Sequence, residues 1–240
     1  MKVGLDFPAY KGVFFDLDGT LADTAPDLVA AANLLRTVRQ LEPLPFETLR
    51  PKASAGARGL IFGTFGYEPD HPEFNILRDE FLNNYEQAIC VNTRLFEGMS
   101  ELLVQLESHQ IAWGIVTNKL ERFTFPLMEQ LQLANRSLAT IGGDTVGVSK
   151  PHPAPVLKAA EICQLDPSEC LYVGDDQRDI EAGQAAGMAT VAAAYGYCGS
   201  DLPIEQWGAD FIIHTPKDLI PIRSEEHTSE LQSQSTISYA

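Results

Sequence analysis

The sequence predicts an α/β fold in which a parallel β-sheet carries helices on both faces and an extra helical module is inserted into the chain. Three observations predict it: short apolar runs recur, each run is followed by a turn, and amphipathic segments separate the runs. Strands that alternate with helices of about 10–15 residues form parallel sheets. Ligands of such sheets bind beyond the carboxyl ends of the strands, so a site is expected there.

Six apolar runs predict the strands of this sheet. In chain order they are GVFFDL (12–17), IAWGIVTN (111–118), SLATIGG (137–143), ECLYVGD (169–175), MATVAAAYG (188–196) and DFIIHT (210–215). Amphipathic segments predict the flanking helices at 97–109, 121–133, 154–165 and 179–187.

From 22 to 95 this alternation is broken. The interval has no convincing strand pattern, but it contains helical segments at 27–41 and 73–88. An inserted helical subdomain is the economical interpretation. We therefore predict a catalytic core of 1–21 and 96–222, with a helical cap domain, 22–95, inserted after the first strand.

The last residues, 223–240, read RSEEHTSELQSQSTISYA and lack any hydrophobic periodicity. A segment this polar cannot bury enough apolar surface to offset the entropy that ordering would cost. RSEEHTSELQS also resembles the translation of a common sequencing-adapter oligonucleotide. We predict a disordered or artefactual tail that takes no part in the fold.

The chain is acidic, and its charge excludes some classes of partner. With 17 basic and 33 acidic residues among 240, it has a formal net charge of −16. Nucleic acids and anionic membranes require basic surface, so neither is expected as a partner. A small anionic substrate is compatible, since a metal ion reverses the charge locally.

The same composition predicts a cytoplasmic protein. The four cysteines show no metal-ligand spacing and are most simply reduced core residues. The beginning of the chain has no signal-like apolar region, and no apolar stretch approaches the ~20 residues that span a bilayer. The oligomeric state is not indicated, and a monomer is the default.

The first predicted strand ends in two aspartates, Asp16 and Asp18, on either side of Leu17. In an extended chain, residues i and i+2 face the same side about 7 Å apart, so both carboxylates point toward one site. Gly19 permits a sharp exit from the strand, and Thr20 adds a hydroxyl. Taken alone, this stretch has an alternative interpretation as an Asp-Gly turn that merely ends the strand.

Three further stretches carry polar groups toward the same edge of the sheet. VTN ends the second strand, SKPHP precedes a helix, and GDDQRD follows the fourth strand. Their polar residues are Thr117, Asn118, Lys150, Asp175, Asp176 and Asp179. Each stretch alone has a structural explanation, as a helix cap or a solvated lysine. Together they supply acids, a hydroxyl and a cation at one edge, which indicates a catalytic site.

DLDGTLADT, VTN, SKPHP and VGDDQRDIEAGQAAG resemble, in order and spacing, the four signature motifs of the haloacid dehalogenase superfamily. The resemblance extends to about Leu219 and implies a Rossmann-like core with that superfamily's helical cap. Within the superfamily, the chain is similar to the phosphoglycolate phosphatase-like branch. ASAGARGL, FEGMSELL and IAWGIVTNK resemble, more narrowly, bacterial N-acetylmuramic acid 6-phosphate phosphatases of peptidoglycan recycling.

This resemblance implies a Mg²⁺-dependent phosphatase that acts on a small carboxylated phosphate ester. Mg²⁺ would be held by the Asp16 carboxylate, the Asp18 backbone carbonyl and Asp175, with Asp176 or Asp179 in support. Asp16 would attack phosphorus and form an aspartyl-phosphate. Asp18 would protonate the leaving alkoxide and then accept a proton from the hydrolytic water.

The resemblance also implies residues that bind the substrate. Thr117 and Lys150 would bind the phosphoryl oxygens and stabilise developing charge. Thr20 and Asn118 are expected beside the phosphate. Arg58, in the ASAGARGL stretch of the predicted cap, is a candidate partner for a substrate carboxylate. A surface arginine on a cap helix is the alternative interpretation of Arg58.

Several alternative functions stay open. N-acetylmuramic acid 6-phosphate and 2-phosphoglycolate both carry a carboxylate, so Arg58 does not separate them. A β-phosphoglucomutase-like phosphomutase uses both aspartates and a similar cap. Asp18 disfavours a dehalogenase, which has no leaving alkoxide to protonate. A phospho-accepting receiver has similar residues in a shorter chain, and a non-catalytic binding module would be expected to have lost a catalytic position.

Overall fold

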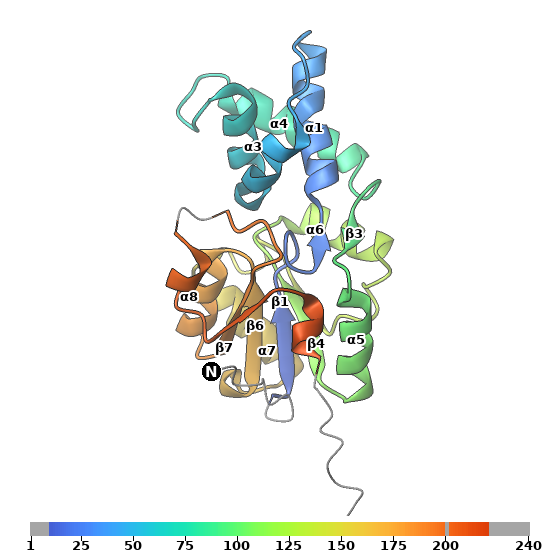
Figure 1. Ribbon diagram of the computed structural model, residues 1–240, viewed down its shortest axis with the longest axis vertical. Coiled ribbons are helices and arrows are strands. Elements are labelled where there is room, and N and C mark those ends of the chain that lie inside the picture. The colour runs from blue at the N-terminus through green and yellow to red at the C-terminus, as the bar shows by residue number, and fades with distance from the viewer. Residues whose placement is uncertain (1–9, 200–201, 221–240) are drawn as a thin grey trace, which may run out of the picture.

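The computed structural model describes residues 10–199 and 202–220. A six-stranded parallel sheet in the order β5-β4-β1-β6-β7-β8 forms its core (Figure 1). The strands are β1 (Gly12–Phe15), β4 (Ala112–Val116), β5 (Ala139–Ile141), β6 (Cys170–Gly174), β7 (Ala189–Ala193) and β8 (Phe211–Ile213). All six predicted strands are present, and the predicted α/β fold class is confirmed.

Helices cover both faces of the sheet. They are α5 (Met99–Ser108) and α6 (Glu121–Gln130) on one face, and α7 (Ala154–Cys163) and α8 (Gln177–Ala185) on the other. Val13 and Phe15 of β1 cluster with α5 and α6, whereas Phe14 clusters with α7 and α8. Because successive residues of a strand point to opposite faces, a central strand between two helix layers is buried throughout.

The helices of residues 25–87 lie apart from the sheet, at the end toward which β1 points (Figure 1). They are α1 (Ala25–Val38), α2 (Phe46–Leu49), α3 (Gly56–Phe65) and α4 (Phe74–Gln87), with the 3-10 helix η2 (Arg50–Ala55) before α3. We call residues 25–87 the cap layer. The predicted helical cap domain, 22–95, contains these helices, and the division of the chain into domains stays a prediction. The predicted tail, 223–240, lies outside the described residues.

Two very short strands, which the sequence pattern did not indicate, join the cap layer to the sheet. β2 (Ala22–Asp23) and β3 (Arg94–Leu95) pair antiparallel where the chain enters and leaves the layer. Three 3-10 helices, Pro167–Glu169, Ile204–Gln206 and Pro216–Leu219, complete the described elements.

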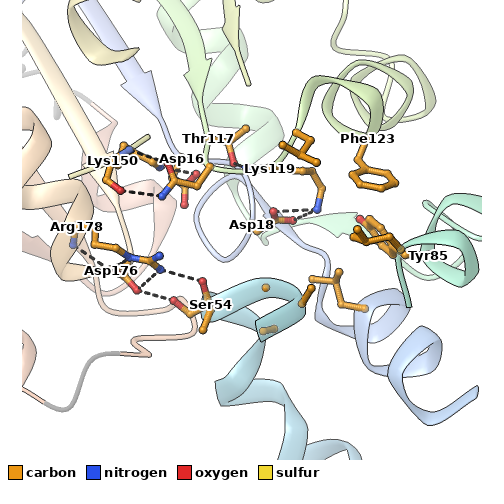
Figure 2. Close-up of a pocket in the computed structure, with 18 of the residues that line it drawn as sticks. Asp16, Asp18, Ser54, Tyr85, Thr117, Lys119, Phe123, Lys150, Asp176 and Arg178 are labelled. Carbon is orange, nitrogen blue, oxygen red and sulfur yellow. Dashed lines mark hydrogen bonds and ion pairs between the residues drawn. The ribbon is translucent and has the colours of Figure 1, made fainter. Parts of the chain in front are cut away.

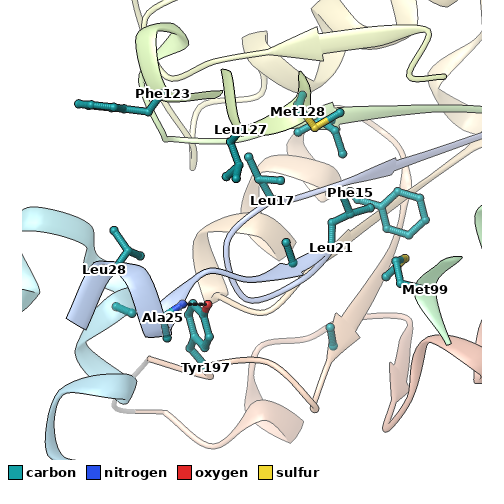
Figure 3. Packing of buried hydrophobic residues seen from close by; sticks show 14 of the residues in the cluster. Phe15, Leu17, Leu21, Ala25, Leu28, Met99, Phe123, Leu127, Met128 and Tyr197 are labelled. Carbon is teal, nitrogen blue, oxygen red and sulfur yellow. Dashed lines mark hydrogen bonds between the residues drawn. The ribbon is translucent and has the colours of Figure 1, made fainter. Parts of the chain in front are cut away.

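One apolar cluster continues from the sheet into the cap layer (Figure 3). It includes Phe15 at the end of β1, Leu21 in the following turn and Leu28 on α1. Tyr197 packs in the same cluster, and its hydroxyl accepts a hydrogen bond from the Ala25 backbone N–H at 2.8 Å. The first turn of the cap layer is therefore anchored directly to the core.

Among the residues that the structure describes, no helix combines the length and the apolar character that crossing a bilayer requires.

Candidate active site

Three neighbouring strands end side by side, and a predicted site residue follows each of them. β1 lies between β4 and β6, and the residues that follow their last positions are Asp16, Thr117 and Asp175. The Asp16 backbone N–H donates to the carbonyl of Val173 at 2.9 Å, which extends the pairing to the edge. The chain runs from β1 to β4 and β5 on one side and later to β6, β7 and β8 on the other. This is a topological switch point, where open α/β sheets bind ligands.

Lys150 is the cation at the centre of this edge. Its Nζ lies 2.9 Å from Asp16 Oδ1 and 2.7 Å from Asp179 Oδ1, and it donates to the carbonyl of Val116 at 3.0 Å. Burial by itself would lower the pKa of Lys150, but the two carboxylates outweigh it and raise the pKa well above its ordinary value. The buried ammonium therefore stays charged.

Asn118 fixes the backbone at Lys150. Its amide Nδ2 donates to the Lys150 carbonyl at 3.0 Å, and its Oδ1 accepts from the Lys150 N–H at 2.9 Å. These two bonds join the end of β4 to the loop that carries the lysine. Asn118 also lines the cavity described below, so a contact with substrate stays a prediction.

Asp16, Asp175 and Asp179 form a compact group of carboxylates. One oxygen from each lies within 4.8 Å of the others. Burial raises the pKa of Asp175 well above its usual range, and the Asp16 and Asp179 carboxylates add to this shift. Burial likewise raises the pKa of Asp179, to about 7. The positive charge that the protein itself supplies is therefore too small to compensate these three carboxylates.

The donor set of this group fits a hard divalent cation. With all three carboxylates in their anionic form, the single ammonium of Lys150 would leave two negative charges uncompensated, which one divalent ion would balance. Asp16 Oδ1 is buried and, apart from the ion pair to Lys150, accepts no hydrogen bond from the described chain. Oxygen ligands of this kind are those that Mg²⁺ prefers.

Thr20 orients one of these carboxylates. Its hydroxyl is buried and donates to Asp175 Oδ1 at 2.8 Å, while the Tyr197 backbone N–H donates to Asp175 Oδ2 at 2.7 Å. Gly19 has a φ of +87°, and a Cβ at this position would overlap the Asp175 carboxylate. The glycine predicted to allow a sharp turn therefore also allows Asp175 to approach the end of β1.

Asp176 lies outside the carboxylate group. It caps α8, and its carboxylate accepts from the Arg178 side chain at 2.8 and 2.9 Å and from the Ser54 hydroxyl at 2.7 Å. Burial alone would raise its pKa, but these donors outweigh it and lower the pKa to about 2. Because Ser54 belongs to η2, Asp176 connects the core to the cap layer (Figure 2).

Asp18 points to a different part of the edge from Asp16. Lys119 Nζ lies 3.0 Å from each of its carboxylate oxygens, and the Thr24 hydroxyl donates to Oδ1 at 2.5 Å. Each of the two strand-end aspartates therefore has a lysine of its own (Figure 2).

A cavity of about 330 Å³ opens between this edge and the cap layer. On the core side it is lined by Asp16, Asp18, Thr117 and Lys150 among others. On the cap side it is lined by one face of α4, formed by Arg78, Phe81, Leu82 and Tyr85, and by Ser54 to Ala57. The site is therefore charged at its base and largely apolar beneath α4.

Arg58 does not line this cavity. Its side chain is 67% exposed and pairs with Glu68 at 3.2 Å on the surface of the cap layer. Within the cavity lining, the arginines are Arg78 and Arg178. The turn of α3 that follows Ala57 directs Arg58 away, so its predicted contact with a substrate carboxylate has no geometric support here.

The cavity residues that sequence reasoning missed include Ser54, Arg78, Tyr85 and Lys119. Lys119 had a signal, because it directly follows the Thr117-Asn118 pair at the end of a strand. Arg78 and Tyr85 lie seven residues apart, a spacing that puts them on one face of a helix. Nothing in the sequence indicates which face of that helix meets the core.

Comparisons with known proteins agree with this geometry. A family model described as haloacid dehalogenase-like hydrolase matches residues 13–193. The chain is 42% identical over 212 residues to the N-acetylmuramic acid 6-phosphate phosphatase of Pseudomonas aeruginosa, covering 88% of this chain and 94% of that protein. It is 41% identical over 210 residues to the phosphoglycolate phosphatase of Xanthomonas campestris pv. campestris, covering 87% and 94%. A crystal structure of a predicted phosphoglycolate phosphatase from Haemophilus somnus has a TM-score of 0.77 at 29% identity, covering 88% and 96%.

Proposed function

Because the chain belongs to the haloacid dehalogenase-like hydrolase family, we propose that it is a Mg²⁺-dependent phosphomonoester hydrolase acting on N-acetylmuramic acid 6-phosphate. The membership predicted from the sequence motifs is confirmed. The observation that carries the proposed reaction is the group of Asp16, Asp175, Asp179 and Lys150 at the base of a cavity that the cap layer covers. Cytoplasmic action stays a prediction from the sequence.

Asp16, Asp175 and Asp179 are the carboxylates that would hold Mg²⁺, together with the Asp18 carbonyl inferred from the family resemblance. When bound, the ion supplies the positive charge that lets a carboxylate approach a phosphate dianion. Asp176 takes no part in this set, because its carboxylate is already engaged by Arg178 and Ser54.

Different residues of the chain then act as nucleophile, phosphate-binding groups and acid/base at the phosphorus atom. An Asp16 oxygen attacks phosphorus and becomes the aspartyl-phosphate oxygen. Thr117 and Lys150 donate to the phosphoryl oxygens and stabilise the charge that develops on them. Asp18 gives a proton to the departing alkoxide and later removes one from the water that hydrolyses the aspartyl-phosphate.

The shape of the cavity supports a substrate with a sizeable organic part. A volume of about 330 Å³ falls within the range of sites for small molecules. Phosphoglycolate, with only two carbons beyond its phosphate, would leave the space under Phe81, Leu82 and Phe123 unfilled. An acylated sugar phosphate offers both apolar and polar groups to that space. The larger ester is therefore the better match.

We assign recognition of the substrate carboxylate to Arg78. This residue lines the cavity from α4, and its guanidinium pairs with Asp79, an exposed neighbour in the chain. Arg78→Ala should raise KM for N-acetylmuramic acid 6-phosphate about tenfold, while KM for N-acetylglucosamine 6-phosphate, which lacks the carboxylate, changes less than threefold.

Arg58→Ala is the matched control for this prediction, since it removes an arginine that lies outside the cavity. Steady-state kinetics on the two esters compare the variants directly. A larger effect of Arg58→Ala than of Arg78→Ala on the carboxylated ester would contradict our assignment and restore the residue predicted from the sequence.

Two measurements test the function itself. Purified protein should release inorganic phosphate from p-nitrophenyl phosphate with Mg²⁺ and not after removal of divalent ions; no release under either condition would overturn the hydrolase proposal. Values of kcat/KM for N-acetylmuramic acid 6-phosphate, 2-phosphoglycolate and hexose phosphates then rank the substrates. A preference for 2-phosphoglycolate would overturn the substrate, and transfer of phosphate to a second sugar hydroxyl would indicate a mutase.

The alternatives from other classes have little support. The family match covers 13–193 and includes the helical insertion that a receiver domain lacks. Each position expected to be catalytic is occupied by a residue of the required chemistry, which disfavours a non-catalytic binding module.

A further inference from the structure

Lys119 is a buried lysine to which the proposed reaction gives no role. Its side chain is 6% exposed, and its Nζ lies 3.0 Å from both carboxylate oxygens of Asp18. Burial by itself would lower the pKa of Lys119, but the adjacent Asp18 carboxylate outweighs it and raises the pKa above its ordinary value. Lys119 is therefore a fixed positive charge next to the predicted proton donor.

Tyr85 brings the cap layer into contact with this ion pair. It lies on α4, the residue is 1% exposed, and the Lys119 Nζ lies 4.6 Å from the ring centre (Figure 2). An ammonium at this distance is attracted to the ring face. The ring also contacts Phe123 of α6, with 5.7 Å between ring centres. Lys119 is thus enclosed by Asp18 from the core and by an aromatic ring from the cap layer.

The Tyr85 hydroxyl is buried and makes no hydrogen bond within the described residues. Burial raises the pKa of Tyr85 to about 12, so the phenol is neutral and offers the ammonium an uncharged aromatic face. Its surroundings belong to the cavity, which Tyr85, Lys119 and Asp18 all line.

We propose that Lys119 is a positioning residue for proton transfer by Asp18, and that Tyr85 places Lys119 when the cap layer covers the cavity. The inference rests on the proposed hydrolase function and assigns a role to two residues that the function does not require by itself. The Thr24 hydroxyl also donates to Asp18 Oδ1 at 2.5 Å, so the carboxylate is held by a hydroxyl and an ammonium. Loss of the ammonium leaves Oδ2 without a hydrogen-bond partner among the described residues.

The charge of Lys119 acts at one defined moment of the reaction. In the first step the Asp16–phosphorus bond forms and the ester bond breaks, while the Asp18 proton passes to the alkoxide and leaves a carboxylate. The adjacent ammonium stabilises the negative charge that Asp18 acquires. In the second step water attacks phosphorus, its proton returns to Asp18, and Asp16 and inorganic phosphate are released. The proton count is restored, and no other reactant is needed.

This timing makes the inference testable through the leaving group. p-Nitrophenolate departs without a proton, whereas phenolate and alkoxides need one from Asp18. The Lys119→Met variant, which keeps an unbranched side chain one atom shorter and removes its charge, should lower kcat/KM for phenyl phosphate at least about tenfold more than for p-nitrophenyl phosphate. The alkyl ester N-acetylglucosamine 6-phosphate should be affected at least as much as phenyl phosphate.

The two aryl esters differ little in size, so an effect on cavity shape would change both alike. Lys158→Met removes an exposed lysine of α7 and serves as the matched control. It should leave unchanged the ratio of kcat/KM for phenyl phosphate, or for N-acetylglucosamine 6-phosphate, to that for p-nitrophenyl phosphate. Tyr85→Leu, which removes the ring, should shift the same ratio in the same direction by about threefold. It also provides the comparison if Lys119→Met does not fold.

The outcomes separate this inference from the function on which it rests. Equal losses on the three esters in Lys119→Met and in Tyr85→Leu, or no loss at all, would overturn the positioning role while leaving the hydrolase intact. No phosphate release by the wild-type protein from any ester would overturn the hydrolase proposal and this inference together. A selective loss in Lys119→Met with none in Tyr85→Leu would keep the role of Lys119 and remove that of the cap layer.

Discussion

Lys150 and Lys119 are two buried lysines that each pair with a strand-end aspartate, yet their surroundings differ in one respect. The partners of Lys150 all come from the core: Asp16, Asp179 and the carbonyl of Val116. Lys119 is shared, since it pairs with Asp18 from the core but lies against Tyr85 from the cap layer. Two lysines of similar burial therefore depend on different parts of the molecule.

This difference suggests how the proposed chemistry is divided. The groups for the phosphoryl end of the substrate are held by neighbouring strand ends and do not need the cap layer. The groups for the leaving-group end are completed only where α4 covers α6. When the cap layer covers a substrate of the right size, Tyr85 would also be placed against Lys119. This contact would complete the environment of the proton donor, Asp18.

The largest effect is expected at the core side. Asp16→Asn removes the proposed nucleophile but little volume, so it should reduce phosphate release by at least about a thousandfold. The loss should be the same for p-nitrophenyl phosphate and for alkyl esters, unlike the loss in Lys119→Met. Single-turnover kinetics measure it, and circular dichroism should show an unchanged fold. Activity within about tenfold of wild type would place the nucleophile elsewhere.

An effect of intermediate size is expected when Mg²⁺ binds the carboxylates of the core. The resulting gain in stability should depend on pH. Burial raises the pKa of Asp175 and raises that of Asp179 to about 7, whereas an unfolded aspartate titrates near 3.9. A carboxyl group with a raised pKa favours the folded state at low pH, and this contribution is lost as the pH rises through its folded value. Without metal, these two groups should therefore make the protein less stable at pH 8 than at pH 5.

A divalent cation removes that penalty, so Mg²⁺ should raise Tm more at pH 8 than at pH 5. At saturating ion the stabilisation should reach about 1–3 kcal/mol. Thermal unfolding with Mg²⁺ or with a chelator at the two pH values measures the effect, and Asp175→Asn should reduce it. A larger Mg²⁺ shift at pH 5 would contradict the assigned ligands.

The smallest effect is expected at a direct contact between the core and the cap layer. Ser54→Ala removes the hydroxyl that donates to Asp176 at 2.7 Å. Loss of one such bond should cost about 1 kcal/mol of stability and raise KM for sugar phosphates by less than about threefold. Ser108→Ala, at the exposed end of α5, is the control. A large loss of kcat in Ser54→Ala would mean that the catalytic groups of the core depend more on the cap layer than we propose.

The sequence indicated the parts of this site that depend on local pattern. Six strands were recognisable because each is a short apolar run between turns. Asp16, Thr117 and Asp175 were recognisable because each directly follows such a run. In a parallel sheet the carboxyl ends of neighbouring strands lie at one edge. The residues that follow the predicted strands therefore make up much of the candidate site.

The sequence could not separate residues of the same type that lie close together. Asp176 and Asp179 were equal candidates to support a metal. In the structure Asp176 caps α8 and turns toward Ser54, whereas Asp179 lies one helical turn later, buried under β6 and paired with Lys150. Arg58 was chosen from its neighbourhood in the sequence, but Arg78 lines the cavity.

The α/β fold, the helical segment that follows β1 and the chemistry available at the sheet edge could all be predicted from sequence patterns. The contact of Tyr85 with Lys119, the partner of Asp18, and the direction in which each acid of GDDQRD points are known from the structure alone. Strand periodicity and strand-end turns are properties of a few neighbouring residues, whereas a contact between α4 and α6 depends on how two segments far apart in the chain pack against each other.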